Sequence, residues 1–459
     1  MLNSWYDSIV QVGEFSLLSA VVVGGGLWLL NQNQAQADEL LDDISVENAL
    51  AKLNEGIAKT EVIIHQIIQE AVNHPQIKTL QDQLSQLHLE LDRQEIQIAV
   101  TGSKSVGKST VIQTLKNVEG LSKHSLHFVE TSPLFAEIGE NSDLVILSKL
   151  QTSDVVLFLT NGDLTNSEFQ VWQKLKALKQ PTLLVFNKQD QYIAEDRNII
   201  LQSLQQKTGG NVVATAVSPL PVKVKKHETD GTIQEWMEQP APNIQELTQN
   251  LGQILSAQAQ YLVCKTTLRK VLLLKAEAKN CLNQIRGDRS SPIIEQNQWI
   301  AAAAAFANPL PALDILATAA INAQMVVDLG NIYQQKISLE QAQQVAATMG
   351  SLMLKLGLVE LSTKAVTGIL KTNAITFVAG GVVEGVSAAY LTRIAGLSLV
   401  AYFEQQEIAL ETGNGLNLEK LRQVLQTVFQ QNQRMAILET FVKQGVKRLL
   451  PDTKPVEVV

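Results

Sequence analysis

The sequence predicts an α/β domain built on a parallel, three-layer sheet, with a membrane-anchor helix before it and an α-helical bundle domain after it. Three observations support this order. Short apolar runs alternate with helical periodicity between about residues 94 and 243, which is typical of β-α units. Helical periodicity then continues almost unbroken from 244 to 455, and an uncharged apolar run stands at Phe15–Leu30. The expected segments are therefore an anchor over 1–31, a helical linker over 32–93, and the two domains.

Composition excludes several classes of protein. The 459 residues include 37 Lys and Arg against 45 Asp and Glu, a net charge of −8. This acidic balance argues against nucleic acid as a partner, because nucleic-acid-binding domains usually carry a basic stripe. Hydrophobic residues make up 45% of the chain, so most of it is not disordered. Only two cysteines occur, Cys264 and Cys281, which indicates reduced thiols rather than a disulfide scaffold.

The N-terminal run predicts a membrane contact. Phe15–Leu30 is 16 residues long, and as a helix it would measure about 24 Å, somewhat less than a ~30 Å hydrocarbon core. Trp5 and Trp28 lie where interfacial aromatic residues anchor a helix. No Lys or Arg precedes the run, so a cleavable signal peptide is disfavoured. We expect a single-pass or membrane-associated protein with its bulk facing the cytosol. A buried or interfacial helix is the alternative.

Two amphipathic helices are expected between the anchor and the sheet. They cover Val46–Ala71 and Ile77–Leu91, with a break at His74-Pro75, and each repeats Leu or Ile at helical spacing. The stretches are too short to favour a coiled coil. We therefore expect both helices to pack on another part of the chain.

A phosphate-binding pattern follows the first predicted strand. The alternating run Ile96–Val100 leads into Gly102–Ser109 (GSKSVGKS), and a helix is predicted over Thr110–Val118. Glycines allow the backbone N–H groups of such a loop to surround phosphates at a helix N-terminus. Lys108 would neutralise the β- and γ-phosphate oxygens, and Ser109 would bind Mg²⁺. The candidate nucleotide-binding residues here are Gly102, Ser105, Val106, Gly107, Lys108, Ser109 and Thr110.

A second motif predicts which base is bound. Asn187-Lys188-Gln189-Asp190 follows the apolar strand Leu183–Phe186, at the sheet edge where open α/β sheets bind ligands. The Asp190 carboxylate can accept hydrogen bonds from N1–H and the 2-amino group of guanine. Adenine offers neither group, so discrimination of roughly 10⁴-fold is available. Lys188 would pack over the base, and Asn187 would join this loop to Gly102–Ser109.

Weaker signals complete the α/β pattern. Asp154–Thr160 is a continuous apolar strand, Glu168–Gln180 has helical periodicity, and another short strand begins at Val212. Thr215-Ala216-Val217 follows that last strand. These three residues occupy the place of a loop whose backbone amide contacts the guanine O6.

Residues 95–220 resemble a TRAFAC-type GTP-binding domain of the Era-like group, on the strength of these motifs. Residues 290–405 resemble the bacterial "domain of unknown function 697", which is found fused to such GTPases. The matching residues are Asn308–Asp314 (NPLPALD), Gln324-Met325, Tyr390–Gly396 (YLTRIAG) and Tyr402–Glu404. The resemblance implies a P-loop G domain that binds GTP or GDP with Mg²⁺. By analogy with dynamin-like proteins, the helices on either side of the G domain would form one bundle that senses its state. The expected protein partner is a second copy of the chain or an effector.

Two departures from the GTPase pattern concern hydrolysis. Only 20 residues separate Ser109 from Glu130, too few for the usual switch I, and no threonine is placed to reach Mg²⁺. The second switch motif is replaced by Glu130-Thr131-Ser132-Pro133. Glu130 is a candidate catalytic residue and a candidate Mg²⁺ contact through water. Pro133 has no N–H to give the γ-phosphate. Slow, partner-dependent or absent hydrolysis is expected.

In the C-terminal half, Ala374–Phe403 is the most hydrophobic stretch, but Glu384 and Arg393 interrupt it. We expect a buried bundle helix there rather than a membrane-spanning one. Asp314 and Gln324 are expected to be polar groups satisfied inside the bundle.

Two functions remain open from the sequence. The first is a membrane-associated guanine-nucleotide-binding protein, GTPase-like with degenerate switches. It is favoured by the intact Lys108, Ser109, Asn187 and Asp190. The second is a membrane scaffold whose G domain turns over no nucleotide, which Pro133 and the missing switch I favour.

Overall fold

The computed structural model describes most of the chain from Val46 to Leu450, and the predicted anchor at Phe15–Leu30 and the polar linker after it lie outside the described residues. The described ranges are 46–90, 93–121, 123, 125–135, 146–147, 149–177, 179–210, 212–227, 233–307, 311–372, 381–405 and 417–450. These residues form two compact units, which divide between Lys279 and Asn280.

The first unit is built on a five-stranded sheet in the order β2-β1-β3-β4-β5, and every neighbouring pair is parallel. The strands are β1 (Ile96–Gly102), β2 (Leu126–Glu130), β3 (Val155–Thr160), β4 (Thr182–Phe186) and β5 (Val212–Ala214). Every residue of the central strand β3 is buried, as expected for a parallel sheet that is covered on both faces. The predicted parallel α/β sheet is confirmed.

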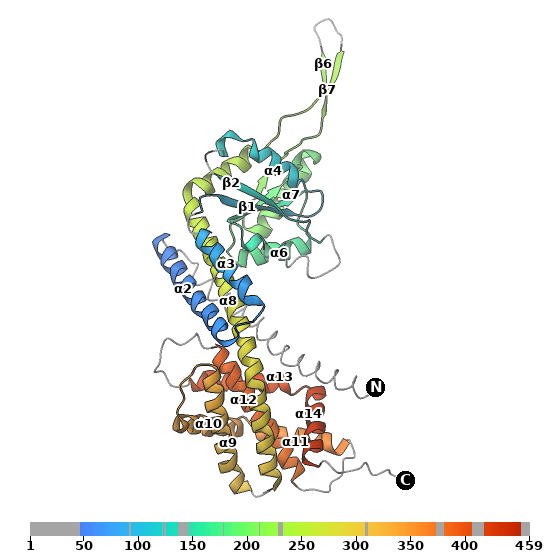
Figure 1. Ribbon diagram of the computed structural model, residues 1–459. Helices are drawn as coiled ribbons and strands as arrows, with labels where there is room; N and C mark the ends of the chain where they lie inside the picture. Colours follow the sequence, from blue (N-terminus) through green and yellow to red (C-terminus); the bar gives the residue numbers. More distant parts are fainter. Residues whose placement is uncertain are drawn as a thin grey trace, which may run out of the picture. The chain divides into compact units, whose positions relative to one another are not determined.

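Helices cover both faces of this sheet and make the three layers (Figure 1). On one face, α4 (Lys108–Lys116) and the first part of α8 (Gln245–Ala307) pack on β1 and β3. The α8 side chains involved include Leu247, Leu251 and Leu255, which are fully buried. On the other face, α6 (Asn166–Ala177) and α7 (Ala194–Thr208) pack on β3 and β4. A helix that follows the sheet in sequence therefore completes the core of the sheet.

The two helices expected before the sheet are present as α2 (Val46–Glu70) and α3 (Gln76–Glu90). Helix α2 lies directly on α8, since a Cβ placed on Gly56 would come within 2.9 Å of the Val271 Cγ1. Helix α3 is joined to α8 by an ion pair from Lys270 to Glu90, with N–O distances of 2.6 and 2.7 Å. Both helices thus pack on another part of the chain, as predicted.

A two-stranded antiparallel hairpin extends away from the five-stranded sheet (Figure 1). It consists of β6 (Val222–His227) and β7 (Ile233–Glu238). All of β7 is exposed. Lys223 and Lys225 both form ion pairs with Glu235 across the strands. The charges of these two lysines are therefore partly neutralised within the hairpin.

The second unit is a helical bundle, as predicted. Its described residues contain the rest of α8 from Asn280 together with six further helices. These are α9 (Pro311–Ile332), α10 (Leu339–Lys355), α11 (Leu358–Thr372), α12 (Val382–Gln405), α13 (Leu418–Asn432) and α14 (Met435–Leu449). Helix α12 lies at the centre of the bundle and contacts α9, α11, α13 and α14. The side chain of Asp314 lies outside the described residues. Gln324 is exposed, and its side-chain amide donates a hydrogen bond to Asp328 on the same helix. The prediction that Gln324 lies inside the bundle is therefore wrong.

Among the described helices, α12 is long and apolar enough to cross a membrane, and α10 with α11 would pass the same test as one pair bent by 69°. In α12, 67% of the most apolar window is buried inside the protein. This burial agrees with the expected bundle helix.

Candidate functional site

The carboxyl end of β1 leads into a tight loop, Gly102–Gly107, which we call the glycine loop. Its conformation requires glycine at both ends. Gly102 has φ +144° and Gly107 has φ +98°. A Cβ on Gly102 would lie 2.3 Å from the Leu159 carbonyl oxygen, and one on Gly107 would lie 2.5 Å from the Asn187 Nδ2. Because the backbone approaches other loops so closely, no side chain fits at either position.

Helix α4 begins at Lys108, directly after the glycine loop. The Lys108 ammonium donates hydrogen bonds of 2.9 Å to the carbonyl oxygens of Gly102 and Ser103, so the side chain folds back over the loop. Burial lowers the pKa of Lys108, and the charge of Glu130 opposes this shift in part. The Lys108 ammonium therefore lies at the N-terminus of α4, and its charge is only partly balanced by Glu130. A helix N-terminus with a cation beside it favours the binding of an anion. Ser105 and Thr110 are exposed beside it.

The neighbouring strand β2 brings Glu130 to the same edge. Val100 and Glu130 are paired in register, and the Ser109 hydroxyl donates a 2.8 Å hydrogen bond to the Glu130 carboxylate. A hydroxyl and a carboxylate are oxygen ligands of the kind that Mg²⁺ accepts, together with water and phosphate oxygens. These two residues therefore fit the metal that the sequence implies.

After Glu130 the chain stays beside β1. The Thr131 N–H donates to the Val100 carbonyl at 3.1 Å, and the Leu134 N–H donates to the Gly102 carbonyl at 3.2 Å. Pro133 lies between the two residues that make these backbone hydrogen bonds. The segment that would face a γ-phosphate is thus fixed by backbone bonds, and its proline offers no donor.

Asn187 joins three loops at this edge. Its Nδ2 donates to the Val106 carbonyl in the glycine loop at 2.9 Å. Its Oδ1 accepts from the Thr215 hydroxyl at 3.2 Å and from the Val217 N–H at 3.3 Å. The side chain is only 3% exposed. The expected contact between Asn187 and the glycine loop is therefore present in the structure.

The other residues predicted to contact the base are Lys188, Asp190 and the Thr215–Val217 loop, and some of their polar groups already bond other parts of the chain. Lys188 adopts a left-handed backbone (φ +63°), and Asp190 is exposed two residues later. One Asp190 oxygen accepts a 2.9 Å bond from the Leu220 N–H, which leaves acceptor sites on the carboxylate. In the Thr215–Val217 loop, where a backbone amide was expected to contact the guanine O6, the Ala216 N–H donates to the Asn243 carbonyl at 3.0 Å. That amide is already engaged, in a short antiparallel bridge just before α8.

Sequence reasoning missed Glu168, which lies under the glycine loop. Its carboxylate accepts a 2.5 Å bond from the Ser103 hydroxyl, and the side chain is 4% exposed. Its other oxygen accepts from the N–H and the hydroxyl of Thr165, both at 2.9 Å. The signal was available, because Thr-x-x-Glu is the pattern of a helix capping box. The same box explains why α6 begins at Asn166, two residues before the expected start.

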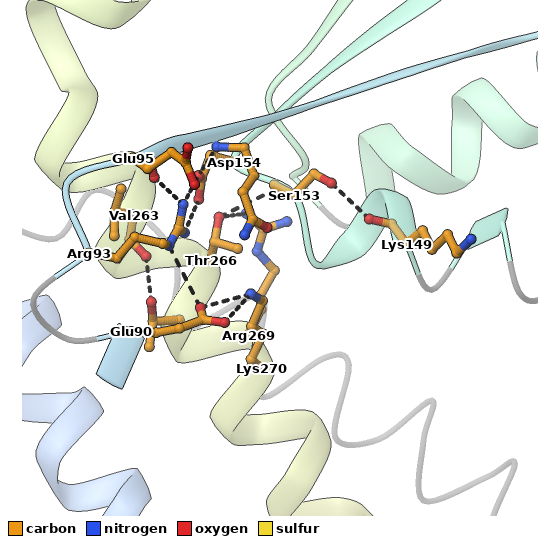
Figure 2. Close-up of polar contacts among 12 residues, drawn as sticks. Glu90, Arg93, Glu95, Lys149, Ser153, Asp154, Val263, Thr266, Arg269 and Lys270 are labelled. Atoms are coloured by element: carbon orange, nitrogen blue, oxygen red, sulfur yellow. Dashed lines mark hydrogen bonds and ion pairs between the residues drawn. The ribbon is translucent and has the colours of Figure 1, made fainter. Parts of the chain in front are cut away.

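A second group of polar contacts lies at the opposite, amino edge of the sheet (Figure 2). Asp154, just before β3, is fully buried and accepts two hydrogen bonds from Arg93, at 2.7 and 2.9 Å. It also accepts the Gln97 N–H at 2.7 Å. Burial opposes the charge on Arg93, but the hydrogen bond and charge of Asp154 outweigh it and raise the pKa of Arg93.

Helix α8 contributes to this amino edge as well (Figure 2). Arg269 donates to the Gln151 carbonyl at 3.2 Å, and the Thr266 hydroxyl donates to the Ser153 carbonyl at 3.4 Å. Burial lowers the pKa of Arg269 to about 10. These contacts join helices to the sheet.

Within the described ranges, no three His, Cys, Asp or Glu residues form a group that would hold a metal at this edge or elsewhere.

The chain was compared with known proteins. Residues 269–434 match the family model described as "Domain of unknown function (DUF697)", as the sequence predicted for the C-terminal half. Among solved structures, a GTP-binding protein from the hyperthermophilic archaeon Sulfolobus solfataricus in complex with GDP is similar, at 15% identity and a TM-score of 0.23. That match covers 37% of this chain and 61% of the archaeal chain. An oligomerised bacterial dynamin pair, described as sensing and tethering membranes, matches at 10% identity and a TM-score of 0.24. It covers 87% of this chain and 80% of the other. No curated protein matches.

Proposed function

We propose that the carboxyl edge of the sheet binds a guanine nucleotide with Mg²⁺. The chain would act as a GTPase-like protein with altered switches, associated with a membrane through residues 1–31 and facing the cytosol. The observation that carries the proposal is Asn187. One buried side chain bonds the glycine loop and the Thr215–Val217 loop, and it thereby brings a phosphate-binding loop and a base-binding loop together.

The phosphates would lie on the glycine loop, against the N-terminus of α4. Lys108 would exchange its two carbonyl partners for phosphate oxygens, because charge-assisted bonds are stronger than bonds to neutral carbonyls. Ser109 and Glu130 would hold Mg²⁺, Glu130 through water. Glu168 would support the loop from below through Ser103.

The base would lie at the Asn187–Asp190 loop. Asp190 keeps acceptor capacity for the guanine N1–H and 2-amino group while it accepts the Leu220 N–H. Lys188 would pack over the ring. A contact from the Ala216 amide to the guanine O6 would require that amide to leave Asn243.

Hydrolysis would be slow or dependent on a partner. Transition-state charge on the γ-phosphate is normally met by preorganised donors. Pro133 provides none, and Thr110 and Thr114 both lie on α4 rather than in a switch loop. A protein effector or a second copy of the chain would have to supply the missing groups. Nucleic acid is not expected among the partners.

The alternative is a membrane scaffold whose degenerate G domain neither binds nor turns over nucleotide. Two observations favour it, namely the Ala216–Asn243 bridge across the expected base site and the fixed segment around Pro133. A measurement of nucleotide binding distinguishes these two proposed functions.

The test is to titrate labelled GDP, GTP and ATP into the purified full-length protein with Mg²⁺. We expect both guanine nucleotides to bind and ATP to bind far more weakly. Asp190→Asn should reduce the guanine preference by at least 10-fold, since its amide N–H₂ opposes the guanine donors. Asp196→Asn, an exposed acid in the first turn of α7, is the matched control. Absence of any nucleotide binding would establish the scaffold instead.

A further inference from the structure

The helical unit contains a cavity of about 620 Å³ between α9, α10, α11 and α12. Protein interiors normally hold few voids larger than a water molecule. Sites for single small ligands measure roughly 300–1,000 Å³. The cavity is therefore of the size of a ligand site rather than a packing defect.

Most of the wall is apolar and adaptable. Met325 on α9 and Met349 and Met353 on α10 all line it, and these are three of the six methionines in the chain. Leu391 and Leu399 on α12 close the other side. Methionine has an unbranched, flexible side chain, and it is used where an apolar surface must fit ligands of variable shape. This wall suits a flexible hydrocarbon chain.

The polar groups in the wall have unused hydrogen-bonding capacity. Ser387 and Thr392 are 5% and 1% exposed, and in the described part of the chain neither hydroxyl has a hydrogen-bond partner. In the same unit, the hydroxyls of Ser362 and Ser398 each donate to the carbonyl four residues earlier. The Asn322 Oδ1 in the wall also has no partner in the described structure. These three oxygens are themselves buried, so they add little polar surface to the wall, which stays mainly apolar.

The charge of the wall limits the kind of head group. Glu384 is the one ionisable side chain among the described residues that line the cavity, and it lies one turn before Ser387 on α12. Glu384 and Leu354 are both exposed, so they mark the open side of the cavity. A carboxylate there repels an anionic head group and accepts hydrogen bonds from a hydroxyl.

We infer that this cavity binds a single-chain amphiphile with a neutral, hydroxyl-bearing head, of the monoacylglycerol class. The acyl chain lies along the methionine wall, and the glycerol hydroxyls meet the exposed Glu384 at the open side of the cavity. This site is independent of the nucleotide site, so either proposal can fail without the other.

The first experiment uses a monoacylglycerol with a photoreactive diazirine in its acyl chain. Purified full-length protein is kept in an amphipathic polymer, because detergent monomers share the chemistry of the probe. After irradiation we expect mass spectrometry to find the label on wall residues of α9, α10 and α12, and excess monooleoylglycerol to reduce it at least 10-fold. Label spread over α13 and α14, or label that does not compete, would overturn the inference.

Two variants test the cavity and the head group separately. Ala388→Phe places a ring in the wall, and it should lower the labelling at least 10-fold without lowering the melting temperature. Gln343→Phe, on the exposed side of α10, should leave labelling unchanged. If Ala388→Phe does not fold, the competed label map of the natural chain still decides the question.

For the head group, monooleoylglycerol should compete at least 10-fold better than oleate. Glu384→Gln should bring the two competitors within about 3-fold, because it removes the repulsion. Glu360→Gln, at an exposed residue of α11 that does not line the cavity, should keep the original ratio. Equal competition in the natural chain would overturn the neutral head group.

Discussion

The positive charge of Lys108 is disfavoured by its surroundings in the protein, and an anionic ligand would favour it. Its ammonium is buried beside two carbonyls, and burial lowers its pKa, so its surroundings disfavour the charge. A group held in this way gains most when phosphate oxygens replace the carbonyls.

Lys108→Ala should therefore reduce GDP affinity by about 100-fold, the effect of one or two charge-assisted hydrogen bonds. The free energy of unfolding should change by less than about 1 kcal/mol, because the charge is not favoured in the folded state. Nucleotide titration and urea unfolding give the two values. Lys116→Ala, at the far end of the same helix, is the control. Unchanged affinity in Lys108→Ala would show that the loop has only a structural role.

At Pro133, the missing N–H predicts weak discrimination between GTP and GDP and an intrinsic hydrolysis rate no faster than roughly 10⁻⁴ s⁻¹. Pro133→Gly should raise the preference for GTP, since it restores a donor near the γ-phosphate. Single-turnover hydrolysis, with and without potassium and lipid, measures the rate. A rate near 1 s⁻¹ without a partner would mean that another residue provides the missing contacts.

At the scale of elements, the amino edge of the sheet is joined to its helices by buried charges (Figure 2). Arg93→Leu should lower the free energy of unfolding by about 3–5 kcal/mol, because Asp154 would remain buried without the cation that donates two hydrogen bonds to it. Urea unfolding measures the loss. The exposed pair between Lys59 and Glu55 on α2 is the matched control, and Lys59→Ala should change the value by less than about 1 kcal/mol. An equally small change in Arg93→Leu would contradict this assignment.

The β6–β7 hairpin should respond to acid. Hydrogen bonds from Lys223 and Lys225 lower the pKa of Glu235 below its ordinary 4.5. The ionic pairs therefore contribute fully above pH 4.5, and they are lost as the pH falls through the lowered pKa. NMR titration of the Glu235 carboxyl at low salt should show a midpoint below 4.5. Replacing both lysines with alanine should return the midpoint to the ordinary value; a normal midpoint in the natural hairpin would refute the effect.

Elements differ in how far the sequence predicts them. The glycine loop and its contact with Asn187 were predicted from the sequence, because each motif is a short run of fixed spacing. Nucleotide binding by these residues stays a prediction. The Ala216–Asn243 bridge and the Arg93–Asp154 pair were not predicted, because they join residues far apart that follow no period. Helical periodicity predicted α8, but periodicity does not say which surface an apolar stripe will cover.

For the whole molecule, the predicted anchor at residues 1–31 gives a direct test of location. Deleting these residues should release the protein from membranes, since Phe15–Leu30 is the longest uncharged apolar run near the N-terminus. Sedimentation with membranes before and after the deletion measures the release. If the shortened chain still sediments, the contact must come from elsewhere, and α12 would be the next helix to examine.

The burial of Leu247, Leu251 and Leu255 against the sheet also limits how this protein can be divided. A fragment that stopped at Asn243 would contain every candidate nucleotide-binding residue and yet leave an apolar sheet face open to water. Such a fragment would aggregate rather than fold. Any division of the chain that keeps this sheet folded must therefore include the first turns of α8.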